Sequence, residues 1–140
     1  MRLVLDASMA LAWIFERVAV EEAALANHLL GVFLDHEVWA PRLWHTEIAN
    51  ALLVAERREV ITSARTHDFL KRLAQLPVKT DERSGLSQQE TILQLAREHQ
   101  LSTYDATYLE LTLHLDATLA TFDRKLALAT NQAGGITFRP

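Results

Sequence analysis

Short apolar runs alternate along this chain with longer stretches of helix-forming residues, and this alternation constrains the fold more than any other feature. The first run is Arg2–Leu5, which is followed directly by Asp6. Another covers residues 117–122 and is followed by Asp123. Runs of this length are typical of buried strands. Strands that alternate with helices favour an α/β fold with a mainly parallel sheet.

The other elements follow from helix propensity and from residues that begin or end helices. We expect further strands at 37–40, 78–80 and 135–139. We expect helices at 8–15, 20–30, 42–58, 63–76, 87–99, 103–115 and 124–130. Ser87, with Glu90 three residues later, has the pattern of a capping box, and Thr103 or Asp105 is expected to cap the following helix.

The composition indicates one soluble domain spanning residues 1–140, because 140 residues with 49% hydrophobic and 23% charged residues suit a single packed core. No apolar run approaches the roughly 20 residues needed to cross a bilayer, and Asp6 interrupts the N-terminal run, so we expect neither a membrane segment nor a signal peptide. The chain has no cysteine. That excludes disulfides and thiolate metal sites and fits a cytoplasmic protein.

Four acidic residues stand where a folded chain can bring them together. Asp6 and Asp123 follow predicted strands, and α/β proteins form their sites beyond the carboxyl ends of strands. Glu47 shares a helix face with apolar residues, and Asp105 begins an apolar helical stretch. Each acid alone is also explained as a turn residue, a helix cap or a half-buried side chain.

Taken together, the four acids predict a metal site. Two carboxylates about 4 Å apart repel by roughly 4 kcal/mol at an effective dielectric constant of 20, so a shared pocket requires a cation. Mg²⁺ and Mn²⁺ prefer oxygen ligands. Such an ion polarises a phosphodiester and lowers the pKa of a bound water. The four acids account for the whole formal net charge of −4, so the charge does not exclude a nucleic-acid substrate.

Several polar residues lie beside these acids in the sequence. Candidates for supporting the acids are Ser8, Asn50, Thr103 and Thr121, although caps and turns explain these residues as well. Arg124 and Lys125 directly follow Asp123 and are candidate phosphate contacts. The six histidines show no spacing typical of metal ligands.

Four segments carry a resemblance to a known family: 4–8 (VLDAS), 41–52 (PRLWHTEIANAL), 102–108 (STYDATY) and 119–126 (LATFDRKL). Together and in this order they resemble the PIN-domain ribonucleases, specifically the VapC-type toxins of bacterial toxin–antitoxin pairs. The resemblance implies a three-layer α/β/α sandwich with a short, mainly parallel sheet, and Mg²⁺- or Mn²⁺-dependent cleavage of RNA. It places Asp6, Glu47, Asp105 and Asp123 in the metal site, with Ser8, Asn50 and Thr121 in support.

The resemblance also implies a homodimer and a small antitoxin whose C-terminal part covers a groove on the toxin. The apolar stretches Ser8–Phe15 and Val20–Leu30, with Trp13, are candidate surfaces for such contacts, although ordinary core packing explains them too. The chain departs from similar proteins at Glu59, where they often carry glycine.

Two other functions use the same residues differently. The same metal site serves a DNase or a structure-specific nuclease, although the short chain has no obvious arch or clamp for structured DNA. A non-catalytic PIN module that only binds a partner is the remaining alternative, and the presence of all four acids argues against it.

Overall fold

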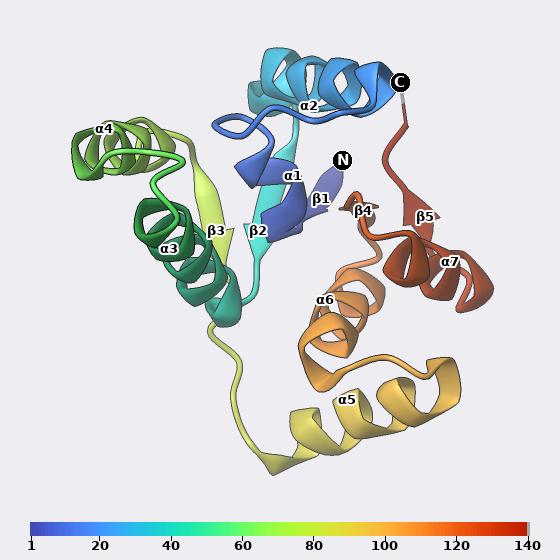
Figure 1. Cartoon of the computed structure of the whole chain (residues 1–140). Helices are drawn as coiled ribbons and strands as arrows, with labels where there is room; N and C mark the ends of the chain where they lie inside the picture. Colours follow the sequence, from blue (N-terminus) through green and yellow to red (C-terminus); the bar gives the residue numbers. More distant parts are fainter. Residues whose placement is uncertain (140) are drawn as a thin grey trace.

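The computed structural model describes residues 1–139, and within this range five strands form one parallel sheet (Figure 1). The strands are β1 (Arg2–Leu5), β2 (Glu37–Ala40), β3 (Val78–Thr80), β4 (Thr118–Ala120) and β5 (Ile136–Thr137). Their order across the sheet is β3-β2-β1-β4-β5, and every pairing is parallel. The expected PIN-like α/β fold with a short parallel sheet is confirmed.

Helices fill the connections between strands. They are α1 (Ala7–Leu11), α2 (Val20–Val32), α3 (Arg42–Arg57), α4 (Ser63–Leu73), α5 (Leu86–His99), α6 (Thr103–His114) and α7 (Arg124–Gln132), with a 3₁₀ turn at Phe33–Asp35. Among residues 1–139, none of the helices combines the length and apolar character required to cross a membrane.

The strand order divides the helices into two groups. The chain steps from β1 to β2 to β3 in one direction, and then returns to place β4 on the other side of β1. Because parallel crossovers are right-handed, α1 to α4 lie on one face of the sheet and α5 to α7 on the other. Figure 1 shows the two groups apart, with α3 and α4 on the left and α5 to α7 at the lower right. Between β1 and β4 the winding reverses, which is where sheets of this kind form their binding crevice.

The core gathers around the central strand and the helix that covers it. Leu3, Val4 and Leu5 of β1 are at most 1% exposed, and α6 packs on both β1 and β4. Tyr108 and Leu109 of α6 are fully buried. Burying an aliphatic side chain of this size contributes about 2 kcal/mol, so these two elements hold each other in place.

Two elements near the carboxyl edge of the sheet are shorter than expected. The first helix ends at Leu11 rather than residue 15, and β4 covers only 118–120. The ladder between β1 and β4 ends at the Leu5–Ala120 pair, and Thr121, just beyond it, bonds to Asp6 through its hydroxyl.

The expected caps of α5 and α6 were wrong. Gly85 precedes α5, so Ser87 lies inside its first turn. Ser102 caps α6, because its Oγ accepts a hydrogen bond from the Asp105 backbone N–H at 3.1 Å. This assignment leaves the Asp105 carboxylate available for another role.

Candidate active site

The carboxyl ends of β1 and β4 lie side by side, so the residues that follow them meet. Leu5 pairs with Ala120 in the sheet, and the Asp6 N–H donates to the Ala120 carbonyl at 3.0 Å. Asp6 therefore leaves β1 at the same point where Thr121 leaves β4. This position is the reversal of winding described above.

Two hydroxyl groups hold the Asp6 carboxylate. Ser8 Oγ donates to Asp6 Oδ2 at 2.6 Å, and Thr121 Oγ1 donates to the same oxygen at 2.7 Å. Asp6 is only 6% exposed. Burial raises the pKa of its carboxyl, the two hydroxyls partly oppose this, and the charge of Asp123 raises it slightly further. Asp6 is thus a fixed carboxylate that lacks a compensating positive charge.

The same hydroxyls also hold the chain that leads to Asp123. The Phe122 N–H donates to Ser8 Oγ at 3.0 Å, and the Asp123 N–H donates to Thr121 Oγ1 at 2.9 Å. Asp123 caps α7 by accepting from the Leu126 N–H through Oδ1 at 2.9 Å. The cap uses one carboxylate oxygen of Asp123, so capping and metal binding are compatible at this residue.

Glu47 reaches the crevice from the other group of helices. The hydroxyl of Tyr108 on α6 donates to Glu47 Oε1 at 2.6 Å and so joins α6 to α3. Burial raises the pKa of the Glu47 carboxyl, the Tyr108 hydrogen bond opposes this, and the charges of Asp6 and Asp105 raise it further. Burial and the charge of Asp6 also raise the pKa of the Tyr108 hydroxyl, so it remains a donor.

Tyr108 was not among the candidate site residues expected from the sequence. The signal that could have identified it is its spacing, because Tyr108 is three residues beyond Asp105 and so projects from the same face of the helix. A tyrosine buried on that face requires a partner for its hydroxyl, and an acidic cluster supplies one.

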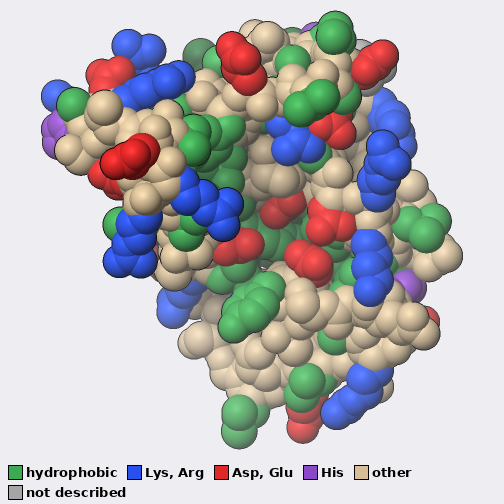
Figure 2. All heavy atoms as spheres, viewed as in Figure 1, with side chains coloured by type: hydrophobic (Ala, Val, Ile, Leu, Met, Phe, Trp, Pro, Cys, Tyr) green, Lys and Arg blue, Asp and Glu red, His purple; other side chains and the backbone are tan. Residues whose placement is uncertain are grey.

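Asp105 completes the group from the first turn of α6. Burial raises the pKa of its carboxyl, and the charges of Asp123 and Asp6 raise it further. Ser102 and Lys125 partly offset this rise, which places the ammonium group of Lys125 near this carboxylate. Figure 2 shows acidic side chains gathered in a hollow at the centre of this face, with Lys and Arg side chains around it.

The structure does not bring every candidate residue to the acids. Asn50, one turn beyond Glu47, is exposed, and so is Thr103 at the start of α6. Within residues 1–139 neither side chain hydrogen-bonds to any of the four acids. Arg124 is likewise exposed, whereas Ser8 and Thr121 bind Asp6 directly.

The carboxylate oxygens of these residues are ligands that a hard divalent cation prefers, although they do not form a complete set of metal ligands. Over residues 1–139, no three His, Asp or Glu side chains stand together at metal-ligand spacing. Mg²⁺ keeps several of its waters and is usually held directly by one or two carboxylates, so it does not require three protein ligands. Carboxylates that raise one another's pKa without a cation are the donor set that such an ion would relieve.

Comparison with known proteins agrees with this geometry. Among solved structures, PAE2754 from Pyrobaculum aerophilum superposes with a TM-score of 0.72 at 25% identity, covering 98% of this chain and 89% of that one. FitAcB from Neisseria gonorrhoeae shares the fold at 14% identity, with a TM-score of 0.66 and coverage of 98% and 96%. No curated protein matches the sequence. The family model of the PIN domain matches residues 3–131, and the chain therefore belongs to the PIN domain family.

Proposed function

We propose that this protein is a Mg²⁺- or Mn²⁺-dependent endoribonuclease and acts as the toxin of a toxin–antitoxin pair. The observation that carries the nuclease proposal is that the four acids surround the reversal of winding and act on one another through their charges: Asp123 on Asp6 and Asp105, and Asp6 and Asp105 on Glu47. Asp6, Glu47 and Asp105 each have a pKa raised by burial and by a neighbouring acid. A fold that keeps this unfavourable arrangement gains most from a bound cation.

One set of residues would hold the cation, and a second set orients the carboxylates of the first. Asp6, Glu47, Asp105 and Asp123 would hold the cation. When bound, the ion supplies charge neutralisation at the phosphodiester and a water of lowered pKa. Ser8 and Thr121 fix the orientation of Asp6, as Tyr108 fixes that of Glu47. Positioned carboxylates of this kind orient water for in-line attack and keep bulk solvent from replacing it.

Lys125 has a separate role in the proposal. Its ammonium group lies near enough to Asp105 to lower the pKa of that carboxyl. A cation at this place attracts the phosphate of an incoming strand without contributing sequence preference. Arg124, exposed like Lys125, would contact a phosphate further from the acids.

The activity is tested by single substitutions that keep shape and remove charge. Asp6→Asn and Asp105→Asn should each lower the rate of RNA cleavage in Mn²⁺ by more than about 100-fold, because a ligand is lost. Asp35→Asn, at an exposed acid outside the crevice, should cleave like the wild type. EDTA should stop the wild-type reaction. Wild-type rates in both site variants would show that the site is wrong.

The choice of RNA over DNA is tested on matched oligonucleotides. The crevice is open enough for a single strand, and the 2′-hydroxyl distinguishes RNA from DNA at such a site. We expect cleavage of single-stranded RNA and little cleavage of the DNA of the same sequence. Equal rates on both would favour the alternative of a less selective nuclease.

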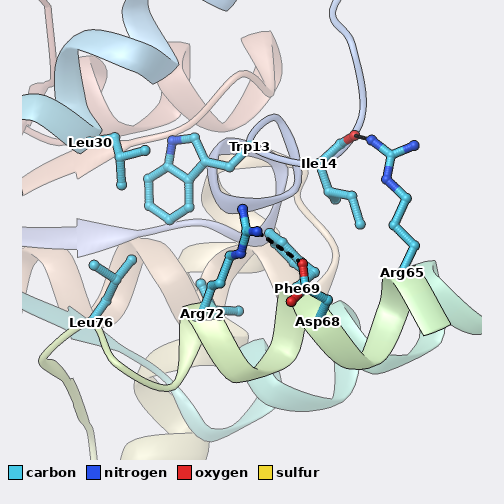
Figure 3. Close-up of a pocket in the computed structure, with 9 residues that line it drawn as sticks. Trp13, Ile14, Leu30, Arg65, Asp68, Phe69, Arg72 and Leu76 are labelled. Carbon is cyan, nitrogen blue, oxygen red and sulfur yellow. Dashed lines mark hydrogen bonds and ion pairs between the residues drawn. The ribbon is translucent and has the colours of Figure 1, made fainter. Parts of the chain in front are cut away.

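An apolar groove away from the acids supports an antitoxin partner. Figure 3 shows Trp13, Leu30, Phe69 and Leu76 around a cavity of about 300 Å³, with Arg72 beside it. The Trp13 indole N–H is already bonded to the Ala26 carbonyl, so the ring offers only apolar surface to the groove. Such a groove suits the apolar face of a partner helix.

The partner is tested with the product of the adjacent reading frame. Co-expression should yield a complex in which RNA cleavage is suppressed. Phe69→Asp, which places a charge in the groove, should weaken the complex without changing cleavage by the free protein. Sedimentation of the free protein tests the expected homodimer.

A further inference from the structure

A cavity of about 350 Å³ lies between the chain segments that follow β2 and β3 and the first turns of α5 and α6. The acids follow β1 and β4, whereas this cavity lies where the chain leaves β2 at Pro41 and β3 at Asp81. Because β2 is the neighbour of β1 in the sheet, the cavity adjoins the acids along one carboxyl edge. A single strand that follows this edge would pass from one to the other.

Helix geometry gives the separation between the cavity and the acids. Leu43 and Tyr104 line the cavity, and they stand four residues before Glu47 and Tyr108 respectively. Residues four apart share a helix face. Since the Tyr108 hydroxyl is bonded to Glu47, the residues that line the cavity precede both partners of that bond by about one helical turn. This places it beside the proposed cleavage centre and not within it.

The charged groups around the cavity favour binding of a nucleotide base over binding of a phosphate group. The guanidinium of Arg83, which is partly exposed, donates to Asp81 at 3.1 Å and to Glu110 at 2.8 and 2.9 Å. These two carboxylates occupy four of its five donors and neutralise its charge, so Arg83 shapes the wall more than it attracts a phosphate. Gln88 and Gln89 add amide groups that can both donate and accept, as recognition of a base edge requires.

An exposed aromatic side chain stands in this cavity. Tyr104, in the first turn of α6, is 67% exposed, whereas Tyr108 one turn later is fully buried. Every base has a π-face that stacks on such a ring. Arg42, also exposed, donates to the Glu82 carbonyl at 2.9 Å and can meet the phosphate that follows the base. Thr103, expected from the sequence to support the acids, lines this cavity instead.

We propose that this cavity is a subsite for the base of an unpaired nucleotide adjacent to the cleaved bond, with Tyr104 as the stacking platform. The inference rests on the proposed ribonuclease function and adds a specificity-determining residue to it. Gln88 and Gln89 read the base edge, and Arg42 holds the neighbouring phosphate.

The first experiment compares Tyr104→Ala, Tyr104→Phe and Arg42→Ala on single-stranded RNA homopolymers of A, U, C and G. Tyr104→Ala should raise KM about tenfold, leave kcat within about twofold and reduce the differences among the four homopolymers. Tyr104→Phe keeps the ring and should behave like the wild type. Arg42→Ala should raise KM equally for all four, whereas Arg97→Ala, exposed further along α5, should change nothing.

The second experiment separates this inference from the proposed function. Fluorescence anisotropy measures binding of the same homopolymers to the Asp6→Asn variant, and this measurement requires no cleavage. Adding Tyr104→Ala to that variant should weaken binding about tenfold. Wild-type protein that binds but never cleaves would overturn the proposed function and leave the subsite standing. Unchanged affinity, KM and base preference in Tyr104→Ala would overturn the subsite. If Tyr104→Ala leaves RNA binding and cleavage unchanged but no longer binds a co-expressed partner protein, the cavity binds that protein and not a base.

Discussion

At the scale of single residues, an acid can cap a helix and also belong to the acidic site. Asp123 caps α7 through one oxygen and still contributes its charge to the group that raises the pKa of Asp105. Asp105 was expected to cap α6, but the Ser102 hydroxyl takes that role. A short side chain at a helix start can serve its helix and a site at once, because capping needs only one acceptor atom.

Tyr108→Phe tests the positioning of Glu47. The change removes the donor at 2.6 Å from Glu47 Oε1 and leaves the ring packing intact. We expect about tenfold weaker Mn²⁺ binding, because groups that orient ligands typically contribute that much. The loss of unfolding free energy should be about 1 kcal/mol. Isothermal titration with Mn²⁺ and urea unfolding measure the two effects.

Thr112→Val is the matched control for Tyr108→Phe. Thr112 is buried on the same helix, and its hydroxyl bonds to the Tyr108 carbonyl, away from the acids. It should change stability without changing Mn²⁺ affinity. If Tyr108→Phe binds Mn²⁺ like the wild type, the tyrosine has only a packing role.

Glu59→Gly should stabilise the protein. Glu59 adopts a φ of 59°, a left-handed conformation that is unfavourable for residues with a Cβ atom. Glycine removes that penalty but adds chain entropy to the unfolded state, so we expect a net gain of roughly 0.5–1 kcal/mol in urea unfolding. Glu56→Gly, inside α3, should lose about 1 kcal/mol. A loss of stability at both positions would contradict the strain argument.

At the scale of elements, one arginine ties the β3–α5 loop to α6. Arg83 in that loop bonds to Asp81, also in the loop, and to Glu110 in the middle of α6. Both carboxylates have side chains less than 10% exposed. Hydrogen bonding to Glu110 raises the pKa of Arg83 above its ordinary value, which burial partly opposes, so it stays charged at any pH of interest. The bond fixes the loop against the helix that carries Asp105 and Tyr108.

Arg83→Leu should therefore destabilise strongly. It leaves two buried carboxylates without their cation, a change that typically costs about 3 kcal/mol or more. Arg72→Ala is the matched control, because it breaks an exposed ion pair: the side chains of Arg72 and Asp68 are 78% and 61% exposed. Such a pair contributes less than about 0.5 kcal/mol to the free energy of unfolding. Urea unfolding of the two variants compares them directly. Similar losses would show that the buried cluster is not a structural tie.

At the scale of the whole molecule, the strand order creates the site. The winding reverses between β1 and β4, which opens a crevice with one group of helices on each side. Glu47 comes from the first group, and Asp105 and Tyr108 come from the second. The hydrogen bond between Tyr108 and Glu47 crosses the crevice, so the two halves of the fold are joined at the proposed reaction centre.

The clustered acids predict an unusual pH dependence of stability without metal. Asp6, Glu47 and Asp105 bind protons more tightly when folded than when unfolded. Their stabilising effect is fully present below the unfolded pKa of about 4 and is lost as pH rises through the higher folded values. In EDTA, the melting temperature should therefore fall as pH rises through this range.

Two additions to the melting series identify the source of that fall. Asp6→Asn should flatten the pH dependence and melt above the wild type at neutral pH. Mn²⁺ at about 100 times its dissociation constant should stabilise the wild type by about 2.7 kcal/mol and should do less for Asp6→Asn. A wild-type melting temperature that neither falls with pH nor responds to Mn²⁺ would contradict the metal site.

Much of the fold was accessible from the sequence because its signals are local. Apolar runs bounded by turn residues gave β1, β2 and β3 at their observed positions, and helix propensity gave α3 nearly to the residue. The capping residues of α5 and α6 were predicted less accurately, since Gly85 and Ser102 compete with nearby residues of similar capping strength. The end of β4 coincides with the end of its pairing to β1, a strand more than 100 residues away, and no local pattern records such a pairing.

The sequence by itself determined which residues carry the proposed chemistry: four acids, placed after strands and on apolar helices, with no cysteine and no histidine motif. Only the tertiary structure decided how the acids meet and what holds them. Strand order brought the end of β1 beside the end of β4, and the packing of α6 against α3 gave Glu47 its tyrosine. The same packing left Asn50 in solvent and turned Thr103 and Tyr104 toward a neighbouring cavity. Residue types are local information, whereas partners depend on which distant segments the sheet places side by side.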